Sequence, residues 1–263
     1  MGKNKFNLSF KWVGAATWVL YVDDVKIACD PVLCPKDTVQ SYAWGMKGKR
    51  RTEPAYVEAD FQNIDLWLIT HNHEDHLDQR GLMVIDPKAT IVTHKNARSL
   101  LLPIHPQKLA SIEWGQTVIY KMKELLIQIE AIPAVHASNS FVALLSGGGN
   151  GYWLNFKKEQ SQLDIYVTGD TVAHEKVLYA LKNRNVDILI PFMGAAFKNI
   201  FGGPLTLTAE GLRALVHSLK PAVILPVHFG TFSHYLEPIS LVEDLSDNRV
   251  KIIKEGQTHT FSR

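Results

Sequence analysis

The chain has 263 residues, of which 46% are hydrophobic and 21% charged, and its mean hydropathy is close to zero. These values are typical of a globular chain with a sizeable core and exclude a disordered protein. The formal net charge of +2 is too small to indicate nucleic acid or an anionic membrane as a partner. Cys29 and Cys34 are the only cysteines, which excludes a disulfide framework, and we expect reduced structural thiols.

The first third of the chain consists of short β-rich runs, and we expect strands at 6–12, 17–22 and 25–29. The apolar stretch 12–22 follows three lysines, as a signal peptide would, but no small-residue cleavage site comes after it. The dipeptide Asp23-Asp24 is typical of a hairpin turn instead. Because no apolar run is long enough to cross a bilayer either, we expect a cytoplasmic protein.

A charged connection with several prolines runs from residue 31 to about residue 60. Connections of this length in a compact domain are often lids or substrate loops. A solvated surface excursion is equally compatible with the composition, so the sequence leaves both interpretations open.

From residue 64 onward, runs typical of strands and helices alternate. The glycine-rich segment 146–151 is typical of a turn, and we expect it to join strands 141–145 and 152–156 into a hairpin. The other expected elements before residue 140 are strands ending at 69 and covering 90–93, 108–112, 117–120 and 124–132, and helices at 79–85 and from about 96.

The last third predicts strands at 164–167, 186–190 and 223–226 and helices at 175–182, 209–219 and 238–245, with Thr208 as the cap of the second helix. Several β runs followed by alternating strands and helices, twice over, predict an α/β fold. Two sheets would pack face to face with helices outside them. We expect a single domain over residues 1–263.

The run His71-Asn72-His73-Glu74-Asp75-His76 directly follows an apolar expected strand. It places three imidazoles and the carboxylate of Asp75 within six residues, and borderline divalent metals such as zinc favour these ligands. Without a cation, four such donors on one tight turn would repel and desolvate one another. The sequence therefore predicts a metal site, and His136, Asp170 and His228 are further candidates because each follows an expected strand.

These motifs, in their order and approximate spacing, resemble the metallo-β-lactamase fold superfamily. The matching segments are Thr70-His71-Asn72-His73-Glu74-Asp75-His76-Leu77-Asp78, His136, Thr168-Gly169-Asp170-Thr171 and Pro226-Val227-His228-Phe229-Gly230. The resemblance implies an αββα four-layer sandwich with a dinuclear site at one edge. The chain also resembles the branch that contains ascorbate-6-phosphate lactonase and the phospholipase D that hydrolyses N-acylphosphatidylethanolamines. The segments that carry this resemblance are Ile27-Ala28-Cys29-Asp30-Pro31, His228-Phe229-Gly230-Thr231-Phe232 and Leu236-Glu237-Pro238. A lipid substrate is not expected, because no apolar surface helix is evident.

Carried over to this sequence, the superfamily pattern implies two divalent ions, with zinc the first choice and manganese the second. A hydroxide bridging the ions would cleave a small lactone or phosphoester, and Asp75 would orient it and accept its proton. The implied ligands are His71, His73 and His136 for one ion, Asp75, His76 and His228 for the other, and Asp170 as the bridge.

Other polar residues near these motifs have two interpretations each. Asp30 either accepts a hydrogen bond from a metal-bound histidine or forms an Asp-Pro turn. His174 and His234 either face the pocket, where they donate a proton to a leaving group or bind a phosphate, or lie exposed. Lys198 and the run Lys49-Arg50-Arg51 either bind an anionic substrate or are solvated.

We therefore expect a metal-dependent hydrolase of a small molecule, anionic substrates included, with no nucleic-acid partner and no stable membrane association; an oligomer stays open. The alternative is a non-catalytic or redox-type member of the same fold. A metal site that keeps a position open to solvent would favour catalysis, whereas a closed site would favour a structural role.

Overall fold

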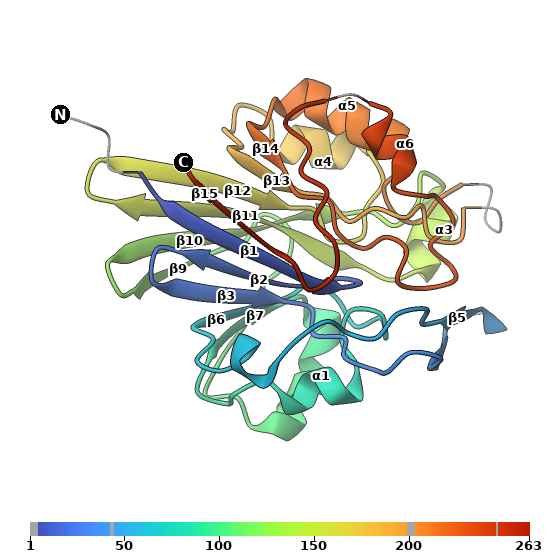
Figure 1. Ribbon diagram of the computed structural model, residues 1–263, viewed down its shortest axis with the longest axis horizontal. Helices are drawn as coiled ribbons and strands as arrows, with labels where there is room; N and C mark the ends of the chain where they lie inside the picture. The colour runs from blue at the N-terminus through green and yellow to red at the C-terminus, as the bar shows by residue number, and fades with distance from the viewer. Residues whose placement is uncertain (1–4, 43–44, 199–202, 246) are drawn as a thin grey trace.

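The computed structural model describes residues 5–42, 45–198, 203–245 and 247–263, and two β-sheets form its centre (Figure 1). The first sheet has the order β15-β1-β2-β3-β6-β7-β8. Its antiparallel part precedes a parallel part that begins between β3 and β6. The strands are β1 (Asn7–Gly14), β2 (Thr17–Val22), β3 (Val25–Cys29), β6 (Leu66–Ile69), β7 (Thr90–Thr93), β8 (Lys108–Ser111) and β15 (Thr258–Ser262).

The second sheet has the order β14-β13-β12-β11-β10-β9. Here too an antiparallel part, β9 to β12, continues into a parallel part, β12 to β14. Its strands are β9 (Thr117–Met122), β10 (Leu125–Ala134), β11 (Gly149–Lys158), β12 (Ser161–Val167), β13 (Ile188–Ile190) and β14 (Val223–Ile224). The strands expected from the sequence are present in both sheets, apart from the one expected at 141–145.

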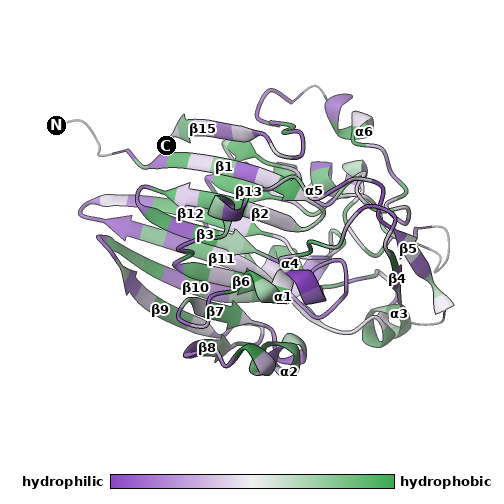
Figure 2. Cartoon of the chain, turned by 60° about the horizontal axis from the view of Figure 1, so that its bottom comes forward, coloured by the Kyte–Doolittle hydropathy of each residue, from purple (hydrophilic) through white to green (hydrophobic). Residues whose placement is uncertain are grey.

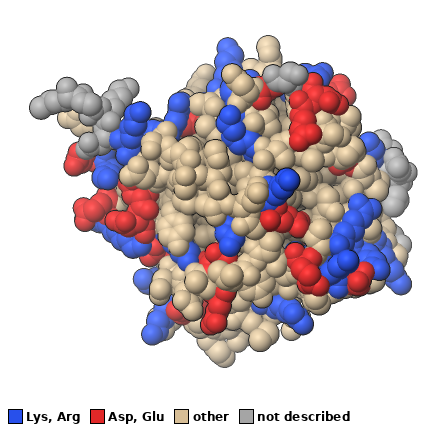
Figure 3. Space-filling view, viewed as in Figure 1, with Lys and Arg blue, Asp and Glu red and all other residues tan. Residues whose placement is uncertain are grey.

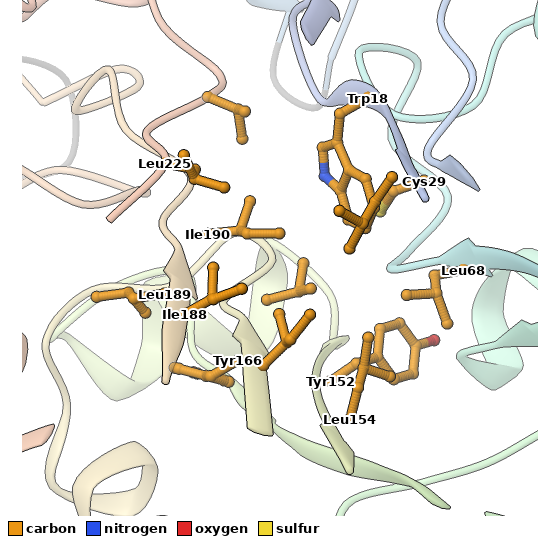
Figure 4. Packing of buried hydrophobic residues seen from close by; sticks show 14 of the residues in the cluster. Trp18, Cys29, Leu68, Tyr152, Leu154, Tyr166, Ile188, Leu189, Ile190 and Leu225 are labelled. Atoms are coloured by element: carbon orange, nitrogen blue, oxygen red, sulfur yellow. The ribbon is translucent and has the colours of Figure 1, made fainter. Parts of the chain in front are cut away.

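Apolar side chains from both sheets meet in one core. Trp18, Cys29 and Leu68 from the first sheet face Tyr152 and Leu154 from the second, and all five are fully buried (Figure 4). Burying a side chain of this size contributes about 1.5–3 kcal/mol relative to its exposure. The predicted packing of two sheets face to face is confirmed.

Helices cover the outer faces of both sheets (Figure 1). On the first sheet lie α1 (Gln79–Met83) and α2 (Arg98–Leu101), and a second apolar cluster packs between them and the strands. On the second sheet lie α4 (Glu175–Ala180), α5 (Ala209–Leu219) and α6 (Ser240–Glu243). The Thr208 side chain accepts a hydrogen bond of 2.9 Å from the Gly211 amide, which confirms the predicted cap of α5. Short 3-10 helices are η2 (Glu58–Asp60), η3 (Lys95–Ala97) and η4 (Leu102–Ile104).

The hairpin expected between 141–145 and 152–156 is wrong. Residues Ser140–Leu145 form a helix, α3, because the Asn139 side chain accepts hydrogen bonds from the Phe141 and Val142 amides and caps it. The strand β11 pairs with β10 and β12 instead. Figure 2 shows α3 as a hydrophobic (green) segment at the edge of the molecule, where Phe141 and Leu144 are exposed.

The long connection after residue 30 carries a small hairpin, β4 (Val39–Ser41) paired with β5 (Lys47–Lys49). Arg50 fixes its base: the guanidinium is fully buried and donates hydrogen bonds to the carbonyls of Val32 and Thr52. Arg50 also forms a β-bridge with Phe232. The β4–β5 hairpin is thereby anchored on the sandwich, at the same end as α3 (Figures 1 and 2).

On the face shown in Figure 3, acidic and basic side chains are interspersed among uncharged ones. No helix in the described part of the chain is long and apolar enough to span a bilayer.

Candidate metal centre

Seven histidine and aspartate side chains converge at one end of the sandwich, from four segments that are far apart in the sequence. The loop after β6 supplies four of them, the segment after β10 supplies His136, the turn after β12 supplies Asp170, and the segment after β14 supplies His228. This convergence follows from the topology, because each of these segments leaves its strand at the same edge. Six of the seven are almost completely buried, and only His73 is partly exposed.

The seven donors form three overlapping groups, each with its ligand atoms within 4.8 Å of one another. The groups are His71, His73 and His136; His71, His76 and Asp170; and Asp75, His76 and His228. The first and third groups are the two sets implied by the sequence, and Asp170 lies between them. The structure thus brings together every residue expected to hold the two ions.

The ring nitrogens and carboxylate oxygens of the cluster point at one another. The distance from His71 Nε2 to His73 Nδ1 is 2.9 Å, and that from His76 Nε2 to Asp170 Oδ2 is 3.1 Å. His228 Nε2 lies 3.5 Å from Asp75 Oδ2 and 3.6 Å from Asp170 Oδ1. A ring of lone pairs at these distances is the arrangement that a divalent cation compensates.

Unpaired atoms provide a test of whether metal ions fit here. Among the described residues, Asp75 Oδ1, Asp170 Oδ1 and His136 Nε2 are buried and have no hydrogen-bond partner. Leaving such an atom buried without a partner costs about 1–3 kcal/mol, and more for a charged group. Coordination of cations would satisfy all three, and no thiolate is near to favour a softer metal, so the residues fit two divalent ions.

Asp30 holds the loop that carries the cluster. Its carboxylate accepts hydrogen bonds from the Thr70 amide and the Thr70 hydroxyl, at 2.7 and 2.6 Å, and its Oδ2 lies 2.8 Å from His76 Nδ1. The Thr70 hydroxyl lies 2.9 Å from His71 Nδ1 as well. Asp30 and Thr70 therefore fix the ring orientation of two ligand histidines from behind, the role that carboxylates take beside metal-bound imidazoles.

Burial and charge shift the pKa values of the cluster in opposite directions. Burial lowers the pKa of His136 to about 3 and that of His71 well below its usual value, which leaves both rings neutral and able to coordinate. Burial opposes a charge on His76 too, but the carboxylates of Asp170 and Asp30 outweigh it and raise the pKa of His76 well above normal. The proton on His76 compensates the same negative charges that a cation would.

His228, His234 and Tyr235 surround the carboxylate of Asp75. The His234 Nε2 atom lies 3.0 Å from Asp75 Oδ2, and the Tyr235 hydroxyl donates a hydrogen bond of 3.1 Å to the same oxygen. Burial opposes the negative charge, yet hydrogen bonds from His228 and His234 lower the pKa of Asp75 well below its usual range. Asp75 is therefore a carboxylate at neutral pH, with its second oxygen free.

Residues 9–228 match the family described as "Beta-lactamase superfamily domain". The chain belongs to the beta-lactamase superfamily. The resemblance expected from the sequence motifs is thereby confirmed.

Curated relatives support a metal-dependent hydrolase of this superfamily. The "UPF0173 metal-dependent hydrolase" of Pyrococcus furiosus is 27% identical over 204 residues, which are 76% of this chain and 82% of the relative. The mitochondrial "N-acyl-phosphatidylethanolamine-hydrolyzing phospholipase D" of Saccharomyces cerevisiae is 22% identical over 246 residues, which are 90% of this chain. The chain spans about half, 51%, of that second relative.

Solved structures share the fold of this superfamily member over nearly its whole length. An isothiocyanate hydrolase from Delia radicum gut bacteria has a TM-score of 0.80 at 21% identity and covers 97% of this chain and 99% of its own. A protein from Veillonella parvula described as a possible metal-dependent hydrolase has a TM-score of 0.79 at 19% identity and covers 99% of this chain and 100% of its own. At these identities the likeness concerns the fold alone.

In this superfamily member a cavity of about 350 Å³ opens directly onto the metal centre. His73, Asp75, His136, Asp170 and His234 are among the residues that line it. The centre therefore keeps a side open to solvent, as catalytic metal sites do and structural ones do not. The volume lies at the lower end of the range for small-molecule pockets.

His174, the other histidine predicted to act in catalysis, does not line this cavity. Its ring accepts a hydrogen bond from the Lys176 amide and caps α4. It lines a neighbouring cavity of about 290 Å³, which shares His136 and Gly147 with the cavity over the metal centre. The four-residue spacing from Asp170 suggested a common pocket, but the turn after Asp170 directs the side chain to the helix instead.

The basic residues proposed for an anionic substrate lie away from the cavity of the metal centre. Lys198 forms an ion pair with Glu237 at 3.6 Å, and Lys49 forms one with Asp37 at 2.7 Å. Arg50 is buried at the base of the β4–β5 hairpin, and Arg51 is exposed. None of the four lines the cavity of the metal centre.

Three aromatic residues of the site were not anticipated. Tyr235 contacts Asp75 and its hydroxyl lies 2.8 Å from His228 Nε2, while Tyr42 and Phe197 line the cavity. Tyr235 could have been found from its position directly after His234. No pattern in the sequence distinguishes Tyr42 or Phe197 from ordinary loop aromatics, because their role depends on where two long loops fold.

Proposed function

We propose that the chain hydrolyses a small, uncharged carbonyl ester, with a lactone as the first candidate, using two divalent ions held by the seven residues of the metal centre. Zinc is the first choice and manganese the second, because an imidazole and carboxylate site accepts either. Two such ions lower the pKa of a bound water to about 7 and supply a nucleophile at neutral pH. The single observation that carries the proposal is the set of unpaired, buried donor atoms on residues that line an open cavity.

Within this proposal Asp75 and His234 handle protons. Asp75 Oδ1 is free of hydrogen bonds and can orient the attacking water and hold its proton. His234 Nε2 lies 3.0 Å from the other oxygen of Asp75, and the ring lines the cavity. His234 is therefore placed to pass a proton from Asp75 to a leaving group.

The charges around the cavity favour a neutral ester over a phosphoester. No described lysine or arginine lines it, whereas the carboxylate of Glu74 does. The stretches 43–44 and 199–202, which the structure does not describe, contain no lysine or arginine either. A phosphoester would have only the two metal ions to pair with its charge, whereas sites for phosphate commonly supply an arginine or lysine as well.

The test compares substrates with metals restored one at a time. Protein is purified without chelator and its metal content is measured by elemental analysis. Hydrolysis of γ-butyrolactone, bis(4-nitrophenyl) phosphate and an alkyl isothiocyanate is then followed with zinc or manganese added. We expect about two metals per chain and turnover of the lactone.

Each other outcome selects a different function. Faster hydrolysis of the phosphodiester would overturn the preference for a neutral ester. Turnover of the isothiocyanate alone would move the assignment to the reaction named for the structural neighbour. Bound metal without turnover of any substrate would favour the non-catalytic or redox-type alternative.

A further inference from the structure

The β4–β5 hairpin forms one wall of the cavity over the metal centre. Ser41, Tyr42 and Met46 from this hairpin line the cavity, and Gln40 Nε2 donates a hydrogen bond of 2.6 Å to the Glu74 carbonyl in the metal-binding loop. The Tyr42 hydroxyl donates to Gln40 Oε1 at 2.8 Å. The position of the Tyr42 ring is thus fixed relative to the metal-binding loop by a chain of hydrogen bonds.

Tyr42 belongs to a continuous aromatic surface beside the metal centre. Its ring centroid lies 5.4 Å from that of Phe197 and 5.0 Å from that of His234, and Phe197 stacks on His234 at 4.6 Å with an angle of 12° between the planes. We call Tyr42, Phe197 and His234 the aromatic wall. Met46, Leu145 and Leu205 contribute further apolar surface to the same cavity.

The three residues of the aromatic wall differ in what else they do. Phe197 is buried among other apolar side chains, and His234 contacts the carboxylate of Asp75. Tyr42 is half-buried and comes from a hairpin outside both sheets. Its ring packs against the edge of the same apolar cluster and also lines the cavity. Sites of this kind fix orientation with a few polar groups and bind the rest of the ligand by apolar contact.

We propose that the aromatic wall selects esters that carry a compact apolar substituent, of about the size of a phenyl ring, next to the bond that is hydrolysed. Tyr42 is the specificity-determining residue. This inference rests on the proposed hydrolysis of a neutral ester and adds the substrate class. When two substrates differ by one methylene group that binds in an apolar pocket, their kcat/KM values differ by roughly 10- to 200-fold.

The experiment measures a ratio within each variant. Wild-type protein with metals restored is assayed on γ-butyrolactone and on γ-phenyl-γ-butyrolactone, and the two kcat/KM values are compared. We expect the phenyl lactone to be preferred, Tyr42→Ala to reduce that preference about tenfold or more, and Tyr42→Phe to retain it. The control is Tyr179→Ala, because Tyr179 is 80% exposed on α4 and does not line this cavity.

Loss of activity on both lactones by the same factor in Tyr42→Ala would overturn the inference, because Tyr42 would then serve catalysis or the metals. An unchanged preference in that variant would overturn it too. Because the ratio is taken within one protein, a partly unstable variant still reports it, and Tyr42→Leu repeats the test with a side chain of more similar size.

A binding measurement separates this inference from the proposed reaction. Phenylacetamide and acetamide, which resist hydrolysis, are titrated calorimetrically into wild-type protein and Tyr42→Ala. Tighter binding of phenylacetamide to wild type, lost in Tyr42→Ala, would support the aromatic wall even if no lactone is turned over. Equal binding of both amides to wild type would contradict it even if lactones are hydrolysed.

Discussion

Asp75 is the carboxylate on which the hydrogen bonds of the metal centre converge, and its two oxygens have different surroundings. Oδ2 lies near His228, His234 and Tyr235, whereas Oδ1 is buried without a partner. The first oxygen is held in place, and in the proposed mechanism the second would be available to a metal ion and to the attacking water.

Asp75→Asn should cut turnover by about 10² to 10⁴, because the amide retains the shape but can no longer hold a proton or the charge. The measurement is kcat with metal content determined on the same sample, and circular dichroism reports the fold. Unchanged turnover in a folded, metal-loaded variant would rule out the proposed role.

Asp30→Asn should weaken metal binding by about 10- to 100-fold while leaving turnover at saturating metal less affected. Asp30 contacts His76 and Thr70 but lies behind the cluster, and its φ of 40° is one that asparagine also tolerates. Competition with a chromophoric chelator measures the affinity. An affinity equal to wild type would mean that Asp30 only forms the turn before Pro31.

The sequence predicts a site residue well when the other residues of the site are its neighbours in the chain. The run from His71 to His76 identifies the metal centre because its donors are neighbours in the chain. His174 shows the limit: four residues after Asp170 it caps α4, and only the direction of the turn decides that. Tyr42 shows the opposite case. It lines the cavity, but it lies in a long loop and no neighbouring motif in the sequence marks it as a site residue.

Among the elements, the β4–β5 hairpin takes its position beside the metal centre because of a glycine. A Cβ on Gly48 would lie 2.1 Å from His234 Nδ1 and 2.6 Å from His234 Cε1. The hairpin can therefore approach the metal centre only because residue 48 has no side chain.

Gly48→Ala should lower kcat/KM at least tenfold, because either His234 or the hairpin has to move, at an overpacking cost of about 1–3 kcal/mol. Gly203→Ala is the matched control: nothing lies within 4 Å of its Cβ, so we expect a change within about 0.5 kcal/mol. Steady-state kinetics and thermal unfolding of both variants provide the measurements. Wild-type activity in Gly48→Ala would show that the hairpin yields without consequence.

Thr208→Ala should lower the free energy of unfolding by about 1 kcal/mol, which for a chain of this size lowers Tm by about 2–4 °C. The threonine hydroxyl satisfies the Gly211 amide at the start of α5, and alanine leaves it without that partner. Thr208→Ser keeps an oxygen at this position and should melt close to wild type. A Tm of Thr208→Ala equal to that of Thr208→Ser would contradict the cap.

Elements with a local signal were predictable, and α3 was not. Thr208 and the apolar spacing of 209–219 predict α5 because capping and packing act together there. Residues 141–145 are apolar throughout, so periodicity cannot separate strand from helix over so short a run. The Asn139 side chain accepts a hydrogen bond from the Phe141 amide and so favours a helix. In addition, β11 is already paired with β10 and β12, so residues 141–145 could not pair with it as a strand.

In the whole molecule, metal binding should stabilise the fold measurably. Removal of the ions with a chelator should lower Tm by about 5–10 °C, since a ligand present at 100 times its Kd contributes about 2.7 kcal/mol. Differential scanning calorimetry before chelation, after it and after return of zinc measures the shift. Chelator already saturated with zinc is the control, and a Tm that does not respond would argue against occupied sites.

The α/β architecture could be predicted at this scale because strand and helix patterns alternate in the right order, and the two sheets were expected on that basis. The path of the connection after residue 30 could not be predicted from the sequence. Its docking depends on the buried guanidinium of Arg50, whose partners are main-chain carbonyls that any sequence would offer.

The donors of the metal centre come from residues 71–76, 136, 170 and 228, and the two sheets each contribute some of them. Two ions at this edge would link the two sheets of the sandwich, because each sheet supplies some of their ligands. A partly folded chain offers only the first four donors, and a complete coordination sphere exists only once the sheets have docked. The protein would therefore bind its ions late in folding. Loss of the ions would weaken the packing between the two sheets before it disturbed the strand pairing within either sheet.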